Sequence, residues 1–504
     1  MAMWNDARQY AASVLSPAVT MSASRGAAWQ PVGPCALIGT PAASDVSHRA
    51  ARPGFGRARN RGLCGFHRKA HLPQNRLRRG MRQQTMRLTR HRTADLESNI
   101  LKHLRTYTDI SRVDLARRLG LAPSTAGIYV ERLIRQGYVK ERNKVARKTG
   151  RPPTVLQLNP ERGEFVGVDF DARNIMALAV DFSDKPLRNT QLEIAESDSI
   201  DQVLRKIEQA VEKVMPKDRS RLLAIGAGVP GLVDCKSGVA VHYEYIAQWK
   251  NIPLAQRLKK KFGVQVFIEN TIRTMALAEL WFGQGLGVKN FHCIGIRSGI
   301  AVGMIQDGQL YCGANRAAGE LGRWRYPHLS PKVAGWFKGG AGANSSFGPE
   351  LQEIASVRAI QRALDQAISD GQQTLLRSSL RPIPIEDVLR AVQQRDPLAL
   401  QIVGEVARGL GWAIGQLILT NDPAKIMLAG PLTALGDHIL QPVRLTIDSL
   451  TSAEGHRNVE IVHSTMGEFI GALGAAALAL HEWKPMHVTG GRGASRSGRR
   501  KVGR

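Results

Sequence analysis

The sequence has few cysteines and no long apolar run. Its five cysteines among 504 residues are scattered and form no Cys-x-x-Cys pair. This spacing excludes a disulfide scaffold and a four-cysteine zinc site, and it suits a reducing cytosol. The longest apolar run, Phe469–Leu480, is 12 residues long, contains two glycines and is too short to span a bilayer. We therefore expect a cytoplasmic protein without a membrane partner.

Acidic residues are scarce at both ends of the chain. The net charge is +28, of which +10 falls on residues 1–80, +11 on residues 81–160 and +7 on residues 484–504. The stretch between, residues 161–483, is neutral. Positive charge gathered in this way attracts polyanions, with nucleic acid the leading candidate. The 43% apolar and 22% charged residues exclude disorder of the whole chain.

Charge and periodicity divide the chain into four predicted segments. Residues 1–86 lack periodicity and are predicted to be a disordered basic extension, either a nucleic-acid arm or the product of a misassigned start codon. Residues 87–160 form a predicted DNA-binding domain and residues 161–483 a predicted effector and oligomerisation domain. Residues 484–504, rich in Gly, Ser and Arg, are predicted to be a disordered basic tail.

The basic segment has the pattern of a winged helix-turn-helix. Its apolar spacing predicts three helices, with Pro123 at the start of the third and Gly137 just beyond its end. Two short strands are expected near Tyr138–Lys140 and Thr154–Leu158, joined by a basic loop. Two helices joined by so short a turn cross steeply, so the second is presented outward.

Side chains off the buried stripe of that helix can reach base edges in a major groove. The loop would lie over phosphates, and the flat Gly-Arg-Pro at its end can place an arginine in a narrow minor groove. The predicted DNA-binding residues are Ser124, Thr125, Ile128, Tyr129 and Arg132 on the helix, and Arg147, Lys148 and Arg151 on the loop. The alternative is a three-helix module used for protein contacts, with a merely solvated loop.

The neutral body alternates strands with helices, which predicts α/β architecture with sheets covered on their faces. A β-rich opening near residue 165 and another near residue 291 indicate two related lobes with a ligand cleft between them. The strands expected are 165–170, 175–180, 222–229, 264–268, 291–296, 300–306, 425–428 and 459–462, and the helices include 201–214, 271–284, 397–420 and 466–482.

Seven stretches of the body form a set of motifs. They are Gly228–Asp234, Trp249–Leu254, Ile268–Thr271, Ala276–Gly283, Asp307–Tyr311, Gly319–Gly322 and Ile426–Gly430. Together these stretches resemble the ROK family of repressors, open reading frames and sugar kinases. The resemblance implies a winged helix-turn-helix followed by a two-lobed, actin-like sugar-kinase domain. It also implies a regulator, because kinase members generally lack a DNA-binding module.

Departures from the family pattern argue against catalysis. The first phosphate loop reads Asp169–Arg173, with side chains where the family has glycines, and the second, Arg297–Ala301, keeps one glycine of three. Thr271 stands where a kinase has its catalytic aspartate, and a hydroxyl is no base near pH 7. We therefore predict no catalytic residues, no cofactor and no enzyme activity.

The family's zinc site is missing as well. Glu320-Leu321-Gly322 is followed by Arg323 where the family has a histidine, and residues 330–350 contain no cysteine. Without thiolates a tetrahedral structural zinc is not expected, so no metal is predicted.

A degenerate sugar cleft remains. The resemblance implies that Asn270 and Glu320 contact sugar hydroxyls, whereas Thr271 and Arg323 depart from the pattern. Arg323 suits an anionic ligand, such as a sugar phosphate or a uronate. Trp249 is predicted to form an apolar wall against one face of the sugar. The alternative is that Arg323 only pairs with Glu320, Trp249 belongs to the core and the cleft binds nothing.

The sequence thus predicts a transcription regulator, a repressor, that binds operator DNA and a carbohydrate-type effector as a homodimer or homotetramer. One alternative is an ATP-dependent, glucokinase-like enzyme with an appended DNA module. A third hypothesis is an architectural repressor with a vestigial cleft.

Overall fold

The structure is a computed structural model whose described residues all lie in one compact unit, Pro73–Arg504. These residues are 95–107, 109–143, 154–337, 347–376, 380–451 and 459–485. The predicted extension 1–86 and almost the whole tail 484–504 lie outside them, so both remain predictions.

The N-terminal module contains three helices, as predicted. The first covers 95–106, the second is α3 (Arg112–Arg118) and the third is α4 (Pro123–Arg135). Proline stands at the first position of α4, where its missing N–H has no intrahelical partner to lose. Gly137 follows the helix with a φ of 78°, a conformation that favours glycine.

A two-stranded wing completes this module. Strand β1 (Val139–Asn143) pairs antiparallel with β2 (Thr154–Leu158), and Ile110 adds a bridge to Leu156. Tyr138, just before β1, stacks on Phe182 of the body and meets Trp483 edge-on. Aromatic contacts of this kind bury large apolar surfaces, so the wing is packed onto the body.

The first lobe is built on a mixed sheet of five strands in the order β10-β6-β3-β4-β5. Strands β10, β6 and β3 are parallel, and β4 and β5 continue as an antiparallel meander. The bounds are β3 (Glu164–Phe170), β4 (Asn174–Asp181), β5 (Pro186–Glu193), β6 (Leu222–Val229) and β10 (Gln265–Asn270).

The second lobe repeats that topology. Its sheet has the order β13-β12-β11-β14-β15, again with a central first strand, a meander on one side and two parallel strands on the other. The bounds are β11 (Phe291–Ile296), β12 (Ile300–Gln306), β13 (Gln309–Tyr311), β14 (Lys425–Ala429) and β15 (Glu460–His463). The expected pair of related lobes is therefore present.

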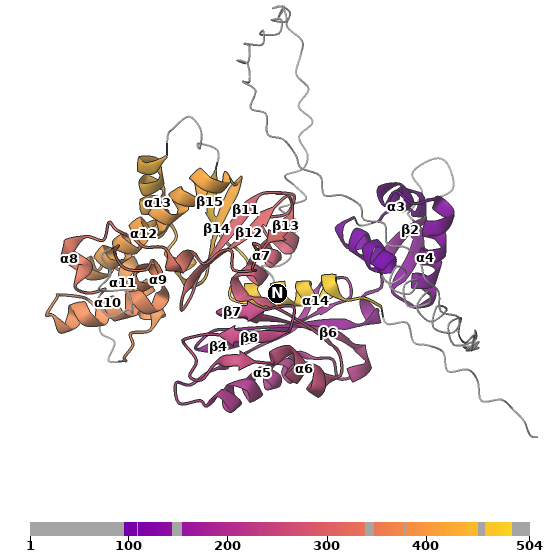
Figure 1. Cartoon of the computed structure of the whole chain (residues 1–504), viewed down its shortest axis with the longest axis horizontal. Coiled ribbons are helices and arrows are strands. Elements are labelled where there is room, and N and C mark those ends of the chain that lie inside the picture. Colours follow the sequence, from indigo (N-terminus) through magenta and orange to yellow (C-terminus); the bar gives the residue numbers. More distant parts are fainter. Residues whose placement is uncertain are drawn as a thin grey trace, which may run out of the picture. The chain divides into compact units, whose positions relative to one another are not determined.

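Two helices lie between the sheets, and Figure 1 shows α14 crossing the body there in yellow. Helix α14 (Ile470–Glu482) packs on β3 and β6, and α7 (Thr271–Phe282) packs on β11 and β12. The helices also touch each other, and a Cβ added to Gly474 would lie 1.7 Å from the carbonyl oxygen of Thr274. Glycine is therefore required where α7 and α14 cross.

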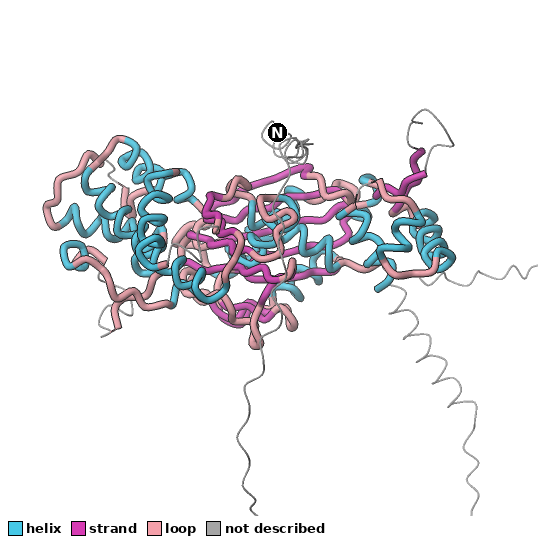
Figure 2. Tube along the Cα trace, turned by 90° about the horizontal axis from the view of Figure 1, so that it is seen from above, coloured by secondary structure: helices cyan, strands magenta, loops and turns pink. Residues whose placement is uncertain are grey.

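The remaining elements cover the outer faces and form a helical group beside the second sheet, seen from another side in Figure 2. The first lobe adds α5 (Ile200–Val214), α6 (Leu254–Phe262) and a small sheet of β7 (Leu232–Asp234), β8 (Val239–His242) and β9 (Lys250–Ile252). The second adds α8 (Pro331–Ala334), α9 (Gln352–Ala355), α10 (Val357–Ser369), α11 (Ile385–Gln393), α12 (Pro397–Asn421) and α13 (Asp437–Leu450). Helix α12 is long and apolar enough to cross a membrane, but most of it is buried in the lobe, which explains its composition.

Candidate DNA interface and ligand cleft

The exposed side of α4 carries most of the predicted base-reading residues. Ser124 and Ile128 are exposed, and Ile128 keeps 61% of its surface open. Thr125 and Tyr129 are half-buried on the same helix, while Ala126 and Val130 face the core. The short hydroxyl and apolar groups are suited to contact base edges and thymine methyl groups.

Arg132 makes an ion pair within the module. Its guanidinium lies 3.2 Å from the carboxylate of Glu97, which is fully buried in the first helix, and 5.3 Å over the ring of Tyr129. A buried carboxylate depends on its cationic partner, so this arginine fixes α4 against the first helix. The structure thus gives Arg132 a positioning role, which helical spacing alone does not reveal.

Further ion pairs hold α4 in place. Arg112 at the start of α3 pairs with Glu131 of α4 at 3.2 Å and with Glu141 of the wing at 2.7 Å. The other predicted contacts, Arg147, Lys148 and Arg151, lie in the wing loop outside the described residues.

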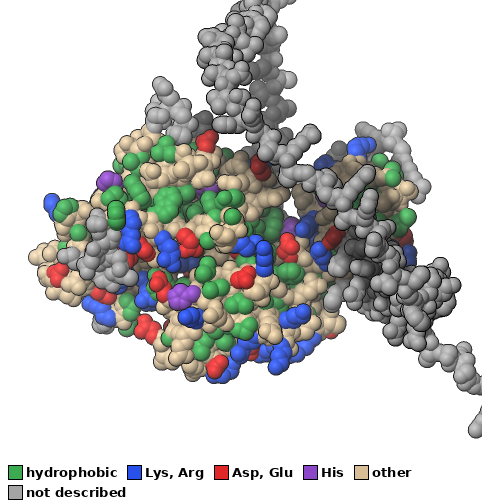
Figure 3. Space-filling model, in the orientation of Figure 1, with side chains coloured by type: hydrophobic (Ala, Val, Ile, Leu, Met, Phe, Trp, Pro, Cys, Tyr) green, Lys and Arg blue, Asp and Glu red, His purple; other side chains and the backbone are tan. Residues whose placement is uncertain are grey.

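In the view of Figure 3, basic and acidic side chains are both present on the surface of the body. This mixture agrees with the neutral charge of residues 161–483. The net positive charge of the chain therefore belongs to its N-terminal part and its tail.

The carboxyl ends of the central strands of the two sheets meet where the lobes face each other. Strand β3 ends near Asp169, β10 ends at Asn270, and β11 of the other lobe leads into Arg297. In open α/β sheets, ligands bind outside the carboxyl ends of the strands. Here the space between these ends is bridged, since Arg297 lies 2.6 Å from Asp169 and 3.5 Å from Asp171.

Asn270, a predicted sugar contact, already makes two hydrogen bonds within the protein. Its side-chain oxygen accepts a 2.9 Å bond from the N–H of Ile272 and so caps α7, while its amide donates to the carbonyl of Gly231 at 2.9 Å. The adjacent Glu269 is buried and paired with Arg273 of α7 and with Arg316 of the second lobe. The pairing of Glu269 with these two arginines was not predicted, although Glu269 lies in the stretch Ile268–Thr271 that resembles the family.

Two other predicted effector residues are buried. Thr271, in the first turn of α7, is buried beside Asp169. Trp249 is only 1% exposed and packs on Phe170 with ring centroids 5.1 Å apart. The structure places Trp249 in the core of the first lobe, so the interpretation as a cleft wall is not supported and the core alternative is.

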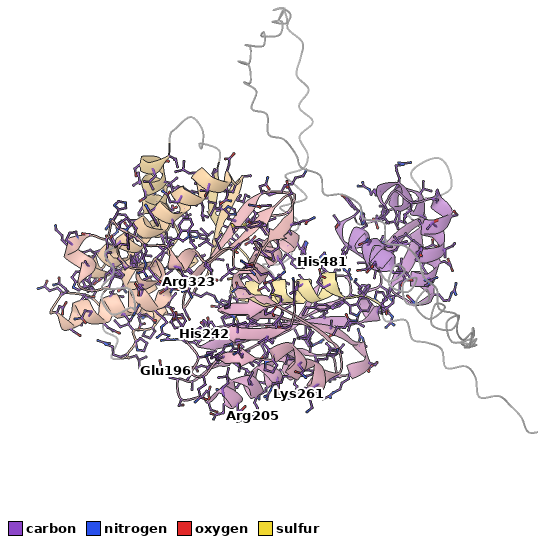
Figure 4. The ribbon with its side chains drawn as sticks, in the orientation of Figure 1. Glu196, Arg205, His242, Lys261, Arg323 and His481 are labelled. Carbon is purple, nitrogen blue, oxygen red and sulfur yellow. The ribbon has the colours of Figure 1, made fainter. Side chains whose placement is uncertain are left out.

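Arg323 and Glu320, the remaining predicted pair, lie at the surface of the second lobe, where Figure 4 labels Arg323. Their side chains are 3.4 Å apart, and Arg323 is 68% exposed. Both are therefore accessible to a ligand, although each already has the other as a partner. Two surface hollows, of about 560 and 300 Å³, lie elsewhere on the first lobe and are lined by none of the five predicted effector residues.

Two further observations concern a thiol and metal-binding side chains among the described residues. Burial and the neighbouring Glu269 raise the pKa of the Cys235 thiol to about 12, so it stays protonated at neutral pH. The part of the chain that the structure describes holds no group of three or more His, Cys, Asp or Glu side chains placed to bind a metal ion.

Comparison with known proteins places these features in a family. The model of the ROK family matches residues 165–482, and the model of a winged helix-turn-helix DNA-binding domain matches residues 94–140. The chain belongs to the ROK family. Its ROK domain accounts for both lobes, and the match to the winged model covers the three helices and the start of β1.

Regulators in this family resemble the chain over both parts. The DNA-binding transcriptional dual regulator NagC of Escherichia coli is 28% identical over 74% of this chain and 89% of its own length. The xylose repressor of Caldicellulosiruptor bescii is 25% identical over 76% of this chain and 96% of its own length. A glucokinase of Halalkalibacterium halodurans is 26% identical but covers 64% of this chain.

The solved structures divide in the same way. A ROK family transcriptional regulator, a homologue of the E. coli MLC protein, superposes with a TM-score of 0.64 at 24% identity, covering 78% of this chain and 97% of its own. A ROK family glucokinase of Streptomyces griseus gives 0.53 at 25% identity and covers 63% of this chain and 99% of its own. These likenesses confirm the predicted fold class, and the ROK regulators span the winged module as well.

Proposed function

We propose that the chain is a transcriptional repressor that binds operator DNA through its winged module and a sugar-type effector in its ROK domain. The observation that carries the proposal is the exposed face of α4, with Ser124 and Ile128 open to a groove, on a basic module joined to a ROK domain that lacks a kinase's catalytic aspartate. Because operator DNA is part of the chromosome, we place the protein in the cytoplasm. We also propose that it is a homodimer or homotetramer, because a symmetric oligomer matches the two half-sites of an operator.

The effector proposal rests on the accessible polar groups at the cleft. Relatives are named for xylose and for N-acetylglucosamine, which supports a sugar or a sugar derivative. Glu320 and Arg323 are exposed enough to contact such a ligand, and Asn270 is half-buried. The guanidinium favours a derivative that carries a carboxylate or a phosphate.

The test is selection of genomic fragments by the purified full-length protein, followed by titration of the selected site. We expect the logarithm of the affinity to fall linearly with the logarithm of the salt concentration, because phosphate contacts release counterions. Ser124→Ala and Ile128→Ala should reduce affinity for the selected site more than for random DNA. Arg390→Ala, on the surface of the second lobe, is the matched control. Binding that is indifferent to salt and to both α4 variants would refute the proposal.

The kinase alternative is favoured by the glucokinase relatives, and it has a direct test. We expect no sugar-dependent ATP consumption in a coupled assay across hexoses and amino sugars, because Thr271 cannot take the proton of a sugar hydroxyl. ATP consumption that depends on an added sugar, above that of an assay without sugar, would establish the alternative.

A ligand screen separates an effector-binding repressor from one with an empty cleft. A ligand that binds only the folded protein raises its melting temperature, by the linkage between binding and folding. We expect a stabilising hit among sugars, sugar phosphates and sugar acids, and we expect Arg323→Ala to weaken a hit that carries an anionic group.

A further inference from the structure

Arg297 joins the two lobes at the point where the carboxyl ends of their sheets face each other. It follows β11 of the second lobe, while its guanidinium reaches Asp169 in β3 of the first lobe and Asp171, which follows that strand. We propose that this interlobe triad, Asp169, Arg297 and Asp171, replaces a bound ligand as the group that holds the cleft closed, so that the ROK domain closes without nucleotide.

The carboxylate end of the triad is built into the first lobe. Asp169 is fully buried, and a Cβ added to Gly228 of β6 would lie 2.7 Å from one of its oxygens. A Cβ added to Gly471, in the first turn of α14, would lie 2.3 Å from the other. Glycines on both sides therefore make room for this carboxylate, and its remaining side faces the arginine.

The arginine end is anchored in the second lobe. The N–H of Arg297 donates to the carbonyl of Gly299 at 2.9 Å, and its own carbonyl accepts from the N–H of Val357, the first residue of α10, at 3.0 Å. Burial alone would lower the pKa of the guanidinium, but Asp169 and Asp171 outweigh this effect and raise it, so the side chain remains charged. Opening of the lobes would leave a buried carboxylate without its partner, which is costly.

Two neighbouring contacts support closure. The guanidinium of Arg358 on α10 lies 4.4 Å over the ring of Tyr245, which belongs to the first lobe. On the other side of the cleft, Arg316 of the second lobe pairs with Glu269 of the first. An anionic ligand entering beside Arg297 would have to compete with Asp169 and Asp171 for its guanidinium, which opposes binding of a nucleotide phosphate there.

The experiment is hydrogen exchange by mass spectrometry on the full-length protein, following peptides over 166–172 and 291–300. The double variant Asp169→Asn/Arg297→Met removes both charges and keeps similar volumes, a replacement that buried ion pairs often tolerate. We expect at least tenfold faster exchange in both peptides in this variant and in Arg297→Ala. Arg390→Ala removes an exposed arginine that pairs with Asp387 within α11, and we expect its exchange to stay within twofold of the wild type.

Wild-type exchange in the double variant, with an unchanged melting temperature, would overturn the proposal. So would protection of the same peptides in the wild type by millimolar Mg·ATP, because a ligand and not Arg297 would then join the lobes. If Arg297→Ala fails to fold, the double variant still decides between the outcomes. None of these outcomes depends on whether the winged module binds an operator.

Discussion

Buried histidines give the ROK domain a dependence on pH that can be assigned to single residues. His292 lies in β11 with 1% of its surface exposed, and burial lowers its pKa from 6.5 to about 4. His481, stacked on Trp281 with centroids 3.8 Å apart, has its pKa lowered by burial and by nearby Arg105 and Lys102. Both imidazoles are therefore neutral in the folded protein at pH 7.

We expect acidification to destabilise the protein through His292. The unfolded chain binds the proton near pH 6.5 and the folded chain only near pH 4, so the unfolded state holds more protons between these values and stability falls as the pH drops through this window. The loss at pH 5 should be about 2 kcal/mol, since one pKa unit corresponds to about 1.4 kcal/mol. Urea unfolding at pH 7.5 and pH 5 measures it, and His292→Leu should remove that part. An equal loss in the variant would contradict the assignment.

Single residues also show where sequence reasoning succeeds and fails. The exposure of Ser124 and Ile128 follows from helical periodicity, because the apolar stripe fixes which side is buried. The pairing of Arg132 with Glu97 does not follow, because it depends on how two helices cross. The contact of Arg297 with Asp169 joins residues 128 positions apart, so the sequence identifies both altered loops but not their ion pair.

At the scale of elements, apolar content decided which strands could be predicted. The predicted bounds of β6, β11 and β12 agree with the structure, because these strands are buried runs. Strand β5 was not predicted, since it starts with a proline, is largely exposed and lies at the sheet edge. The crossing of α7 and α14 was likewise not predicted, because the apolar sequence of each helix does not show which other helix it contacts.

The crossing of α7 and α14 makes a testable contrast between two helical glycines. Gly474→Ala would place a methyl group against the backbone of Thr274, and we expect a cost of about 1–3 kcal/mol or more. Gly127 on α4 has nothing within 4 Å of an added Cβ, so Gly127→Ala should leave stability unchanged or raise it by up to about 1 kcal/mol. Thermal unfolding compares the two variants. Equal melting temperatures would show that the helices separate without cost.

For the whole molecule, the uneven charge is the feature that ties sequence to function. The winged module is basic and the ROK domain is neutral, so a polyanion is attracted to the former. The uneven charge could be predicted from composition, whereas the contact of Arg297 with Asp169 could not, because it joins residues of two different lobes.

At this scale we expect Arg151→Ala to weaken operator binding most at sites with A/T-rich steps, where the minor groove is narrow and its potential most negative. A gel-shift titration against an A/T-rich site and a matched G/C-rich site measures the difference. Lys332→Ala, in the second lobe, is the control for loss of a positive charge alone. Equal affinity of Arg151→Ala and wild type for the A/T-rich site would remove the minor-groove role.

The position of α14 has a consequence for how the protein is made. The first sheet is complete in sequence at Asn270, but the helix that packs on β3 and β6 begins only at Ile470. At roughly 5–20 residues per second, the ribosome leaves that apolar sheet face bare for on the order of 10–40 s. Nascent chains should therefore need a chaperone during this interval, and truncation before α14 should yield an insoluble product even though most of the protein has been synthesised.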